Sequence, residues 1–241
     1  VLQIHEGQGE PDDATIKRIA GWYRRMLDLR AVYLKRFPRD RTATPEPPAE
    51  LYEAEPYLGE AVSPVVVIHE NGLLFGIRPY EGFSVGLFLD QRDNRRRVRE
   101  LAAGRSVLNL FAYTCGFSVA AAAGGATGTV SVDLSPRPLE WGKANFELNG
   151  RTLEGHEFVK AEAADYLARA KKHERQFDMI VIDAPTFARG RKKGTTFSIK
   201  EDLPALVRAA SAVLAKDGVL LVSSNSRQMS TRLLTEKVRE G

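Results

Sequence analysis

The stretch Val107-Leu108-Asn109-Leu110-Phe111-Ala112-Tyr113-Thr114-Cys115-Gly116-Phe117 decides the fold that we expect for this chain. Residues 107–111 are mostly apolar and predict a buried strand, which a tight turn and the start of a helix follow. Such a turn brings backbone N–H groups to a helix N-terminus, where they can contact a ligand. The stretch lacks the G-x-G-x-x-G spacing of dinucleotide-binding turns, so by itself it fits an ordinary strand-to-helix connection equally well.

An alternation of strand and helix continues through the rest of the chain. Short β-rich runs predict strands at residues 107–111, 129–132, 157–159, 179–182 and 219–223. Between them, helices are predicted at residues 118–123, 138–149, 163–172 and 202–214. This order predicts an α/β fold of Rossmann-like type, in which a doubly wound, mostly parallel sheet has helices on both faces. Ligands of such sheets bind at the carboxyl ends of the strands.

Two smaller parts precede this domain. A helix near residues 14–29 and a strand near 31–37 are followed by the Pro-rich run 45–48, which separates them from two apolar runs around Asn71-Gly72. Two such runs joined by Asn-Gly predict a β-hairpin. We therefore divide the chain into a small α+β module at 1–62, a hairpin with a connecting helix at 63–104, and the ligand-binding domain at 105–241. Because the chain stops at Gly241, we expect this domain to be truncated at its C-terminus.

Composition limits the class of protein. Apolar residues make up 43% of the chain, enough for a sizeable core, and 35 basic against 31 acidic residues leave a modest net charge of +4. Basic residues dominate the segment 14–41, which would attract a polyanion such as RNA electrostatically. Tyr23, Tyr33 and Phe37 interleave with these basic residues, and we expect at least two of the three rings to pack in the core.

Several kinds of site and location are not expected. Cys115 is the single cysteine, so no internal disulfide or Cys-rich metal site forms, and the histidines lack metal-ligand spacing. We therefore expect no metal. The sequence has no apolar run of membrane-spanning length and no signal-peptide pattern, which favours a cytoplasmic protein without a membrane partner.

Acidic residues follow the second and third predicted strands. Asp133 ends the second strand just before Ser135, and a carboxylate at this position can accept hydrogen bonds from both hydroxyls of a ribose. After the third strand, Glu162 precedes Ala163 and offers an acceptor for an adenine amino group, with Asp165 as the second choice. Either acid could instead cap the helix that follows.

The fourth predicted strand ends in Asp183-Ala184-Pro185-Thr186-Phe187. A carboxylate, a turn stiffened by Pro185 and the ring of Phe187 can hold a flat base by its edge and its face. A plain strand end with a core phenylalanine is the alternative, and we favour the functional interpretation because all four strand ends supply suitable groups. The basic residues Arg189, Arg191, Lys192 and Lys193 follow and could contact phosphates, although many such runs are simply solvated loops.

Several blocks in the same order resemble a known family, the bacterial class I methyltransferases of 23S ribosomal RNA (the RlmK/RlmI-like group), and most closely its guanine-N7 branch. The matching blocks are Glu70-Asn71-Gly72, 86–92, 108–116, Asp133-Leu134-Ser135, Leu139-Glu140-Trp141, Asn149-Gly150, 183–187 and Ser224-Asn225. They extend over about residues 65–228, most of the chain. One difference is Ala184, where the family usually has the first of two prolines.

The resemblance implies S-adenosylmethionine as the cofactor and 23S ribosomal RNA, or a large-subunit precursor, as the partner. The cofactor pocket that it implies comprises Asn109, Phe111, Tyr113, Thr114, Gly116, Asp133, Ser135, Glu162, Ala163 and Asp183, with Phe88 and Asp90 beside it. The resemblance also implies that Arg92 or Arg95 points toward phosphate, and that Asp183 and Phe187 face the target base. Cys115 is expected to pack rather than to act as a nucleophile.

The residues after the fifth strand narrow the choice of methylated atom. Carbon-5 of a pyrimidine needs a cysteine that adds to the ring, and the family's cytosine-C5 branch has it here, but residues 223–227 contain none. Guanine N7 needs no such help. We hypothesise that Asp183 holds the guanine amino edge, Phe187 stacks and Asn225 orients the ring, with Pro185 stiffening the loop.

Alternatives stay open at this point. An exocyclic base amine is a second acceptor, because the loop at 183–187 also resembles the Asp-Pro-Pro-aromatic loop used there. The chain could also be an RNA-binding or assembly module without catalysis, or, with less support, a methyltransferase of small molecules or proteins. The sequence leaves open the nucleotide, the choice between free RNA and an assembled subunit, and the oligomeric state.

Overall fold

A computed structural model describes residues 1–5, 7, 9–37, 49–185, 187–189, 196–226 and 229–241. The chain forms two compact units, one comprising Val1–Ile68 with Phe75–Leu87 and the other His69–Leu74 with Phe88–Gly241. This division differs from the predicted one, since the helix that we expected to connect two domains belongs to the second unit. In the described part of the chain, no helix has the length and apolar character needed to cross a membrane.

The first unit combines short strands with one long helix. Strand β1 (Leu2–His5) pairs in parallel with β3 (Leu34–Phe37), and β2 (Ala31–Val32) pairs antiparallel with β4 (Leu58–Gly59). The unit also contains the helix α1 (Asp13–Met26) and the 3₁₀ turn η1 (Ala49–Tyr52). Asp12 caps α1 by accepting a hydrogen bond from the Thr15 N–H at 2.7 Å, a common helix start.

Aromatic side chains fill the core of this unit. Tyr33 and Phe37 are buried, and their rings pack against Tyr80 and Phe83 with centroids 5.4 and 5.2 Å apart. Tyr23 is exposed on α1. The prediction that at least two of the three interleaved rings pack in the core is therefore confirmed.

A hairpin of β5 (Val66–Glu70) and β6 (Leu73–Ile77) lies where the chain passes between the two units in sequence. Its turn residues Asn71 and Gly72 have φ values of 51° and 76°. Two positive φ angles in a two-residue connection are typical of a type I′ turn, which Asn-Gly favours. The predicted hairpin is confirmed.

The second unit is built on a five-stranded sheet of order β13-β10-β7-β8-β9, in which every neighbouring pair is parallel. The strands are β7 (Ser106–Leu110), β8 (Gly128–Asp133), β9 (His156–Lys160), β10 (Phe177–Asp183) and β13 (Leu214–Ser223). The chain runs from β7 outward to β9 and then returns to the other side of β7. The order therefore reverses at β7, and ligands of doubly wound sheets bind at such a reversal.

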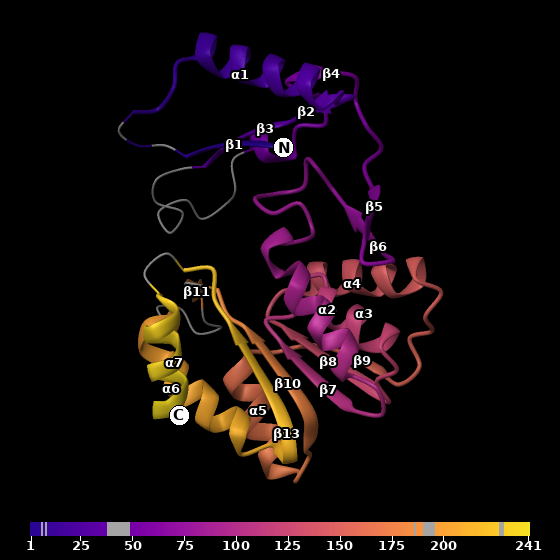
Figure 1. Ribbon diagram of the computed structural model, residues 1–241, viewed down its shortest axis with the longest axis vertical. Helices are drawn as coiled ribbons and strands as arrows, with labels where there is room; N and C mark the ends of the chain where they lie inside the picture. Colours follow the sequence, from indigo (N-terminus) through magenta and orange to yellow (C-terminus); the bar gives the residue numbers. More distant parts are fainter. Residues whose placement is uncertain (6, 8, 38–48, 186, 190–195, 227–228) are drawn as a thin grey trace. The chain divides into compact units, whose positions relative to one another are not determined.

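Helices lie on both faces of this sheet (Figure 1). They are α2 (Arg92–Leu101), which follows the 3₁₀ turn η2 (Leu89–Gln91), α3 (Gly116–Ala123), α4 (Pro136–Leu148), α5 (Ala163–Lys172), α6 (Ile199–Ser211) and α7 (Thr231–Glu240). These bounds confirm each predicted strand and helix of the α/β domain to within a few residues. The predicted Rossmann-like fold is confirmed as well.

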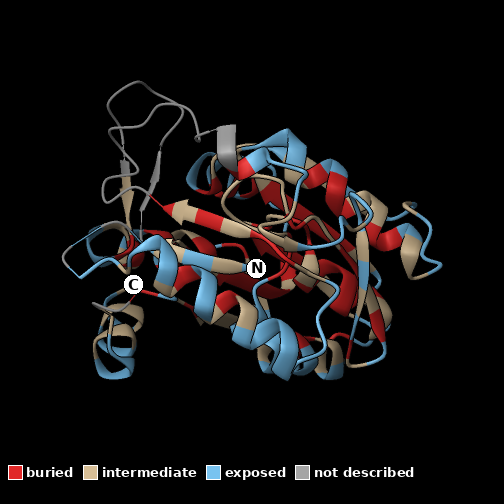
Figure 2. Cartoon of the chain, turned by 90° about the horizontal axis from the view of Figure 1, so that it is seen from above, coloured by how far each residue is buried: buried red, intermediate tan, exposed pale blue. Residues whose placement is uncertain are grey.

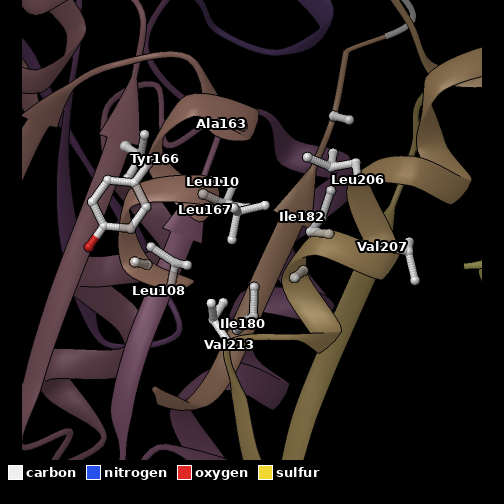
Figure 3. Packing of buried hydrophobic residues seen from close by; sticks show 14 of the residues in the cluster. Leu108, Leu110, Ala163, Tyr166, Leu167, Ile180, Ile182, Leu206, Val207 and Val213 are labelled. Atoms are coloured by element: carbon white, nitrogen blue, oxygen red, sulfur yellow. The ribbon is translucent and has the colours of Figure 1, made fainter. Parts of the chain in front are cut away.

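The two faces of β7 and β10 bury different side chains. Leu108 and Ile180 point toward α5 and α6, where Figure 3 shows them packed with Leu167 and Val207. The alternating residue Val107 points the other way, into a cluster with side chains of α2 and α3. Buried residues consequently run through the strands and the inner sides of the helices (Figure 2). Burial on both faces explains the nearly continuous apolar runs of the strands.

Three elements of the second unit, β11, β12 and α7, were not predicted from the sequence. Strand β11 (Phe187–Arg189) pairs antiparallel with β12 (Thr196–Ser198) beyond the end of β10, and each has only three residues, too few to show a periodicity. The helix α7 has no buried residue, so its apolar pattern is weak, although Ser230 caps it through the Leu233 N–H.

Gly142 in α4 allows the helix to approach the turn after β7, and its replacement gives a test of this contact. A Cβ atom at Gly142 would lie 2.3 Å from the Cys115 Sγ atom, closer than real atoms come. We expect Gly142→Ala to lower the free energy of unfolding by about 1 to 3 kcal/mol, because the site is already filled. Urea unfolding followed by circular dichroism measures the change.

The matched control for Gly142→Ala is Gly21→Ala in α1. A Cβ there meets only the end of the Arg25 side chain, at 3.5 Å, so the better helix propensity of alanine should raise the stability by up to about 1 kcal/mol. Adding Cys115→Gly to Gly142→Ala should restore stability, because it removes the clashing sulfur. Equal stability of Gly142→Ala and the parent protein would contradict this account.

Candidate active site

Parallel register brings two carboxylates to the same edge of the sheet. Asp133 ends β8 and Asp183 ends β10, and β7 lies between these two strands. Neighbouring strands are about 4.8 Å apart, so strand ends two places apart are separated by roughly 10 Å. The turn that follows Leu110 leaves β7 between the two acids. This is the edge at which the sequence predicted a ligand.

The turn after β7 has an unusual backbone. Phe111, Tyr113 and Cys115 have φ values of 57°, 48° and 60°, so every second residue is left-handed although none is glycine. Such a conformation costs roughly 1 kcal/mol or more for each residue with a side chain. It persists only where the surroundings fix it, and this kind of strain often occurs where a backbone must meet a ligand.

Asp133 is one group that fixes the turn. Its Oδ2 atom accepts a hydrogen bond from the Tyr113 N–H at 2.8 Å, and its Oδ1 atom accepts one from the Ser135 N–H at 2.9 Å. Burial raises the pKa of the Asp133 carboxyl, while the backbone N–H groups of Ser135, Tyr113 and Leu134 act in the opposite direction. A carboxylate oxygen accepts more than one hydrogen bond, so Asp133 retains capacity for two hydroxyl groups.

The helix α4 holds the other side of the same turn. The Asn145 side chain donates a hydrogen bond from Nδ2 to the Thr114 carbonyl oxygen at 3.0 Å, and both residues are buried. Cys115 is completely buried, and burial raises the pKa of its thiol to about 12. A thiol without solvent access and without a thiolate form at neutral pH is a poor nucleophile. The prediction that Cys115 has a packing role is therefore confirmed.

Asn109 does not face the open edge of the sheet. Its side chain is 1% exposed and donates a hydrogen bond from Nδ2 to Ser118 Oγ at 2.9 Å, and Ser118 Oγ lies 2.7 Å from Ser131 Oγ. These contacts lie under the start of α3. Asn109 was expected to contact the cofactor. Its side chain is buried and its Nδ2 atom faces α3, so a direct contact stays a prediction.

Asp183 has one engaged and one available oxygen. Its Oδ1 atom accepts hydrogen bonds from Ser223 Oγ at 2.6 Å and from Gln91 Nε2 at 3.0 Å. Within the described residues, its Oδ2 atom has no hydrogen-bond partner. Burial raises the pKa of the Asp183 carboxyl, the Ser223 hydroxyl opposes this rise, and the nearby Asp90 carboxylate adds to it.

Aromatic rings flank the turn on the side of the segment before α2. The ring of Phe88 is half-exposed and lies 5.4 Å from the ring of Tyr113, whose other neighbour is Trp141 at 6.3 Å. Phe88 and Tyr113 were both expected near a cofactor, and the structure brings them together. Asp90 is exposed in η2.

Arg95 was expected to point toward phosphate, but it is buried in an ion pair. Its guanidinium forms two 2.7 Å bonds to the Glu70 carboxylate and a 2.9 Å bond to the Phe88 carbonyl oxygen, and its side chain is only 4% exposed. It is therefore a buried structural group and not a phosphate contact, because Glu70 already neutralises its charge away from solvent. Arg92, the first residue of α2, is exposed.

The remaining predicted cofactor residues lie around the same edge. Glu162 occupies the N-cap position of α5 without a side-chain capping bond, and Ala163 begins that helix. Gly116 begins α3, and Ser135 is the N-cap residue of α4. The helix starts after β7, β8 and β9 thus bring these groups to the edge where Asp133 lies.

Part of the predicted base and RNA contact lies outside the described residues. This applies to Thr186, Arg191, Lys192 and Lys193, and to the side chains of Phe187 and Arg189. Pro185 follows Asp183 and is half-buried. After β13, Asn225 is exposed, and the Ser224 Oγ atom accepts a hydrogen bond from the Ser226 N–H at 3.1 Å. Among the described residues at the ends of β10 and β13, Asp183 and Ser223 lie within hydrogen-bond distance of each other.

Sequence reasoning missed the residues that support this edge. Gln91, Glu70, Asn145 and Ser223 each hold a predicted residue or its backbone in place. Ser223 could have been found from the parallel register, which pairs it with Asp183. Among the described residues, no group of His, Cys, Asp and Glu could hold a metal ion.

The sequence matches a known family over residues 48–241, described as S-adenosylmethionine-dependent methyltransferase. It is 45% identical over 161 residues to the ribosomal RNA large subunit methyltransferase K of Neisseria meningitidis, covering 67% of this chain and 46% of that protein. It is 42% identical over 161 residues to the methyltransferase K/L of a Psychrobacter species, covering 66% of this chain and 20% of that protein. The chain thus spans less than half the length of these relatives.

Solved structures show the same architecture. The chain is similar, with a TM-score of 0.83 and 30% identity, to SMU.776, a protein described as a methyltransferase and complexed with SAH, covering 96% of this chain and 58% of that one. It is also similar to the SAM-dependent methyltransferase of Agrobacterium tumefaciens, with a TM-score of 0.69 and 27% identity, covering 75% of this chain and 59% of that one.

The buried pair of Arg95 and Glu70 predicts a loss of stability when one partner is removed. Arg95→Met leaves the Glu70 carboxylate buried without its partner, so we expect the free energy of unfolding to fall by about 3 to 5 kcal/mol. Arg96→Met is the matched control, since Arg96 is exposed and its ion pairs should contribute less than about 1 kcal/mol. Chemical denaturation of both variants measures the difference, and similar small losses would show that the pair has no such role.

Proposed function

The chain belongs to the S-adenosylmethionine-dependent methyltransferase family, and from this we propose that it forms the catalytic body of an enzyme that methylates a base of large-subunit ribosomal RNA. The names of the relatives support the RNA substrate. The observation that carries the proposal is the pair of carboxylates on either side of β7, of which Asp183 keeps its Oδ2 atom available.

The residues around Asp133 fit the cofactor of the family. Bound S-adenosylmethionine supplies an electrophilic methyl group on a sulfonium. Asp133 has an acceptor position left on each oxygen and would bind the two ribose hydroxyls, while the left-handed turn brings backbone groups of residues 111–115 to the same place. Glu162, beside Ala163 at the start of α5, would accept from the adenine amino group.

Asp183 would act on the acceptor base. Methyl transfer from a sulfonium is an in-line displacement, so the protein mainly aligns donor and acceptor and balances charge. The available Oδ2 atom accepts hydrogen bonds from the amino edge of a base, while Ser223 and Gln91 hold the other oxygen. Phe187 would stack on the base and Asn225 would orient it, with Pro185 stiffening the loop after Asp183.

We favour guanine N7 as the methylated atom. N7 has an exposed lone pair and needs neither a covalent intermediate nor a base. Carbon-5 chemistry would require an accessible cysteine, whereas Cys115 is completely buried and serines occupy positions 223, 224 and 226. An exocyclic amine is the second candidate, because the available oxygen of Asp183 could also accept from that amine.

Basic side chains would contact the RNA backbone. Arg92 at the start of α2 remains a candidate, as do Arg189, Arg191, Lys192 and Lys193 after β10. Together these residues would act without sequence preference, because phosphate contacts position a nucleic acid and base contacts select it.

Replacement of Asp183 tests its role at the base. Asp183→Ala should reduce methyl transfer to large-subunit RNA below detection, while the affinity for S-adenosylmethionine stays within a few-fold, because Asp133 and Glu162 remain. Transfer of labelled methyl groups and calorimetric titration of the cofactor measure the two quantities. Unchanged turnover of the variant would contradict the assignment of Asp183 to the acceptor base.

Analysis of the modified nucleoside tests the choice of atom. After methylation of naked large-subunit RNA and of intact subunits, we expect 7-methylguanosine on digestion and mass analysis. A methylated exocyclic amine would favour the second candidate. If neither substrate is methylated and the cofactor does not bind even at millimolar concentration, the chain is instead an RNA-binding module without catalysis.

A further inference from the structure

Gln91 connects the segment before α2 to the carboxylate at the end of β10. Its side chain is buried, 6% of the residue being exposed, although it lies in a short 3₁₀ turn between the exposed residues Asp90 and Arg92. Its Nε2 atom donates to the Oδ1 atom of Asp183 at 3.0 Å across 92 positions of sequence. A buried amide with this reach is not explained by helix capping, because Gln91 makes no capping bond to α2.

The orientation of the Gln91 amide follows from its two neighbours. Its Oε1 atom accepts a hydrogen bond from Asn94 Nδ2 at 2.6 Å, so the Nε2 atom faces Asp183. An ionised carboxylate only accepts hydrogen bonds, which requires the same orientation. Asn94 and Asp183 thus hold the oxygen and the nitrogen of the Gln91 amide. These two hydrogen bonds connect α2 to the end of β10.

The backbone that carries Gln91 is itself held in place. Arg95 binds the Phe88 carbonyl oxygen at 2.9 Å, and the buried Glu70 carboxylate holds the Arg95 guanidinium. Residues on both sides of Gln91 are therefore anchored by one buried ion pair. This limits the positions that the Gln91 amide can adopt.

We propose that Gln91 is a positioning residue that orients Asp183, so that the Oδ1 atom is occupied and the Oδ2 atom faces the methyl acceptor. The proposal rests on the proposed function for the identity of the acceptor. The orientation of the carboxylate itself does not depend on that function. Ser223 holds Oδ1 from the neighbouring strand β13, and Gln91 supplies a second donor from η2.

The charge of Asp183 depends on the groups around its carboxyl. Burial raises the pKa of its carboxyl and the Asp90 carboxylate adds to this rise, while the Ser223 hydroxyl and the Arg95 guanidinium oppose it. A hydrogen bond donated to a carboxylate favours its charged form. Loss of the Gln91 donor should therefore raise the pKa of Asp183 further, and a second carboxylate at position 91 should raise it more.

Three variants of the full chain test the proposal. Gln91→Met keeps the length of the side chain and removes the donor, and Gln91→Glu puts a like charge against Asp183. Gln176→Met is the matched control, since Gln176 is exposed just before β10. Carbon-13 NMR titration of the Asp183 carboxyl should give the order parent and Gln176→Met, then Gln91→Met, then Gln91→Glu, from lowest to highest pKa.

The kinetic measurement separates positioning from a merely structural role. We expect Gln91→Met to lower kcat/KM for methyl transfer by about 10- to 100-fold, as for a lost hydrogen bond to a charged group, while the Kd for S-adenosylmethionine changes less than about threefold. The acid side of the pH profile should move to higher pH in Gln91→Glu. A Gln91→Met protein with the parent carboxyl titration and parent kcat/KM would overturn the proposal.

The two proposals fail in distinguishable ways. If the parent chain transfers no methyl group to RNA but the NMR titrations follow the expected order, the proposed function is wrong and the positioning of Asp183 by Gln91 stands. If RNA is methylated while the Asp183 titration is the same in Gln91→Met and Gln176→Met, the positioning role is wrong and the proposed function stands.

Discussion

The carboxylate of Asp133 holds the turn after β7 in a conformation that its residues would not adopt alone. Three of the five residues from Phe111 to Cys115 have positive φ values, and the Tyr113 N–H is bound to Asp133 at the end of the neighbouring strand. Together with the hydrogen bond from the Ala112 N–H to the Val132 carbonyl oxygen at 2.9 Å, this contact joins the turn to β8 beyond the last pair of the two strands. The turn is consequently shaped before any ligand arrives, so less of the binding energy is needed to order it.

A second acid, on the other side of β7, is held quite differently. Asp133 is bound by backbone N–H groups, whereas Asp183 is bound by the side chains of Ser223 and Gln91. Backbone donors fix a carboxylate as part of the fold. Side-chain donors from two elements instead leave one oxygen of Asp183 available, as a group that acts on a substrate requires. This contrast is why we assign Asp133 to the cofactor and Asp183 to the acceptor.

Buried polar groups away from the edge keep these elements in register. Arg95 and Glu70 join α2 to the hairpin of β5 and β6, and the Asn149 side chain binds both the N–H and the carbonyl oxygen of Leu74, at 2.9 and 2.7 Å. An unpaired charge or amide in these places would be costly, so the polar groups hold the segment His69–Leu74 against the helices of the second unit. Arg95, in a basic part of the sequence, thus stabilises the fold through its buried pair with Glu70.

The sequence predicted the α/β domain well because strands buried on both faces are nearly continuous in apolar residues, as in 107–110 and 179–182. It also predicted that Asp133 and Asp183 lie at the same edge, since parallel strands end there. It did not predict where individual side chains point. Asn109 and Arg95 have suitable chemistry for ligands, but both side chains are buried. The alternation along β7 turns Asn109 toward α3, and Arg95 pairs with the distant residue Glu70. A partner 25 positions away leaves no local signal.

The central claim is that a cofactor bound at Asp133 presents its sulfonium toward Asp183, on the other side of β7. A crystal structure of this chain with S-adenosylhomocysteine tests it most directly. The account predicts both ribose hydroxyls within hydrogen-bond distance of the Asp133 carboxylate and the sulfur on the side of the Asp183 Oδ2 atom. A ligand whose ribose lies away from Asp133, or whose sulfur points away from Asp183, would contradict it.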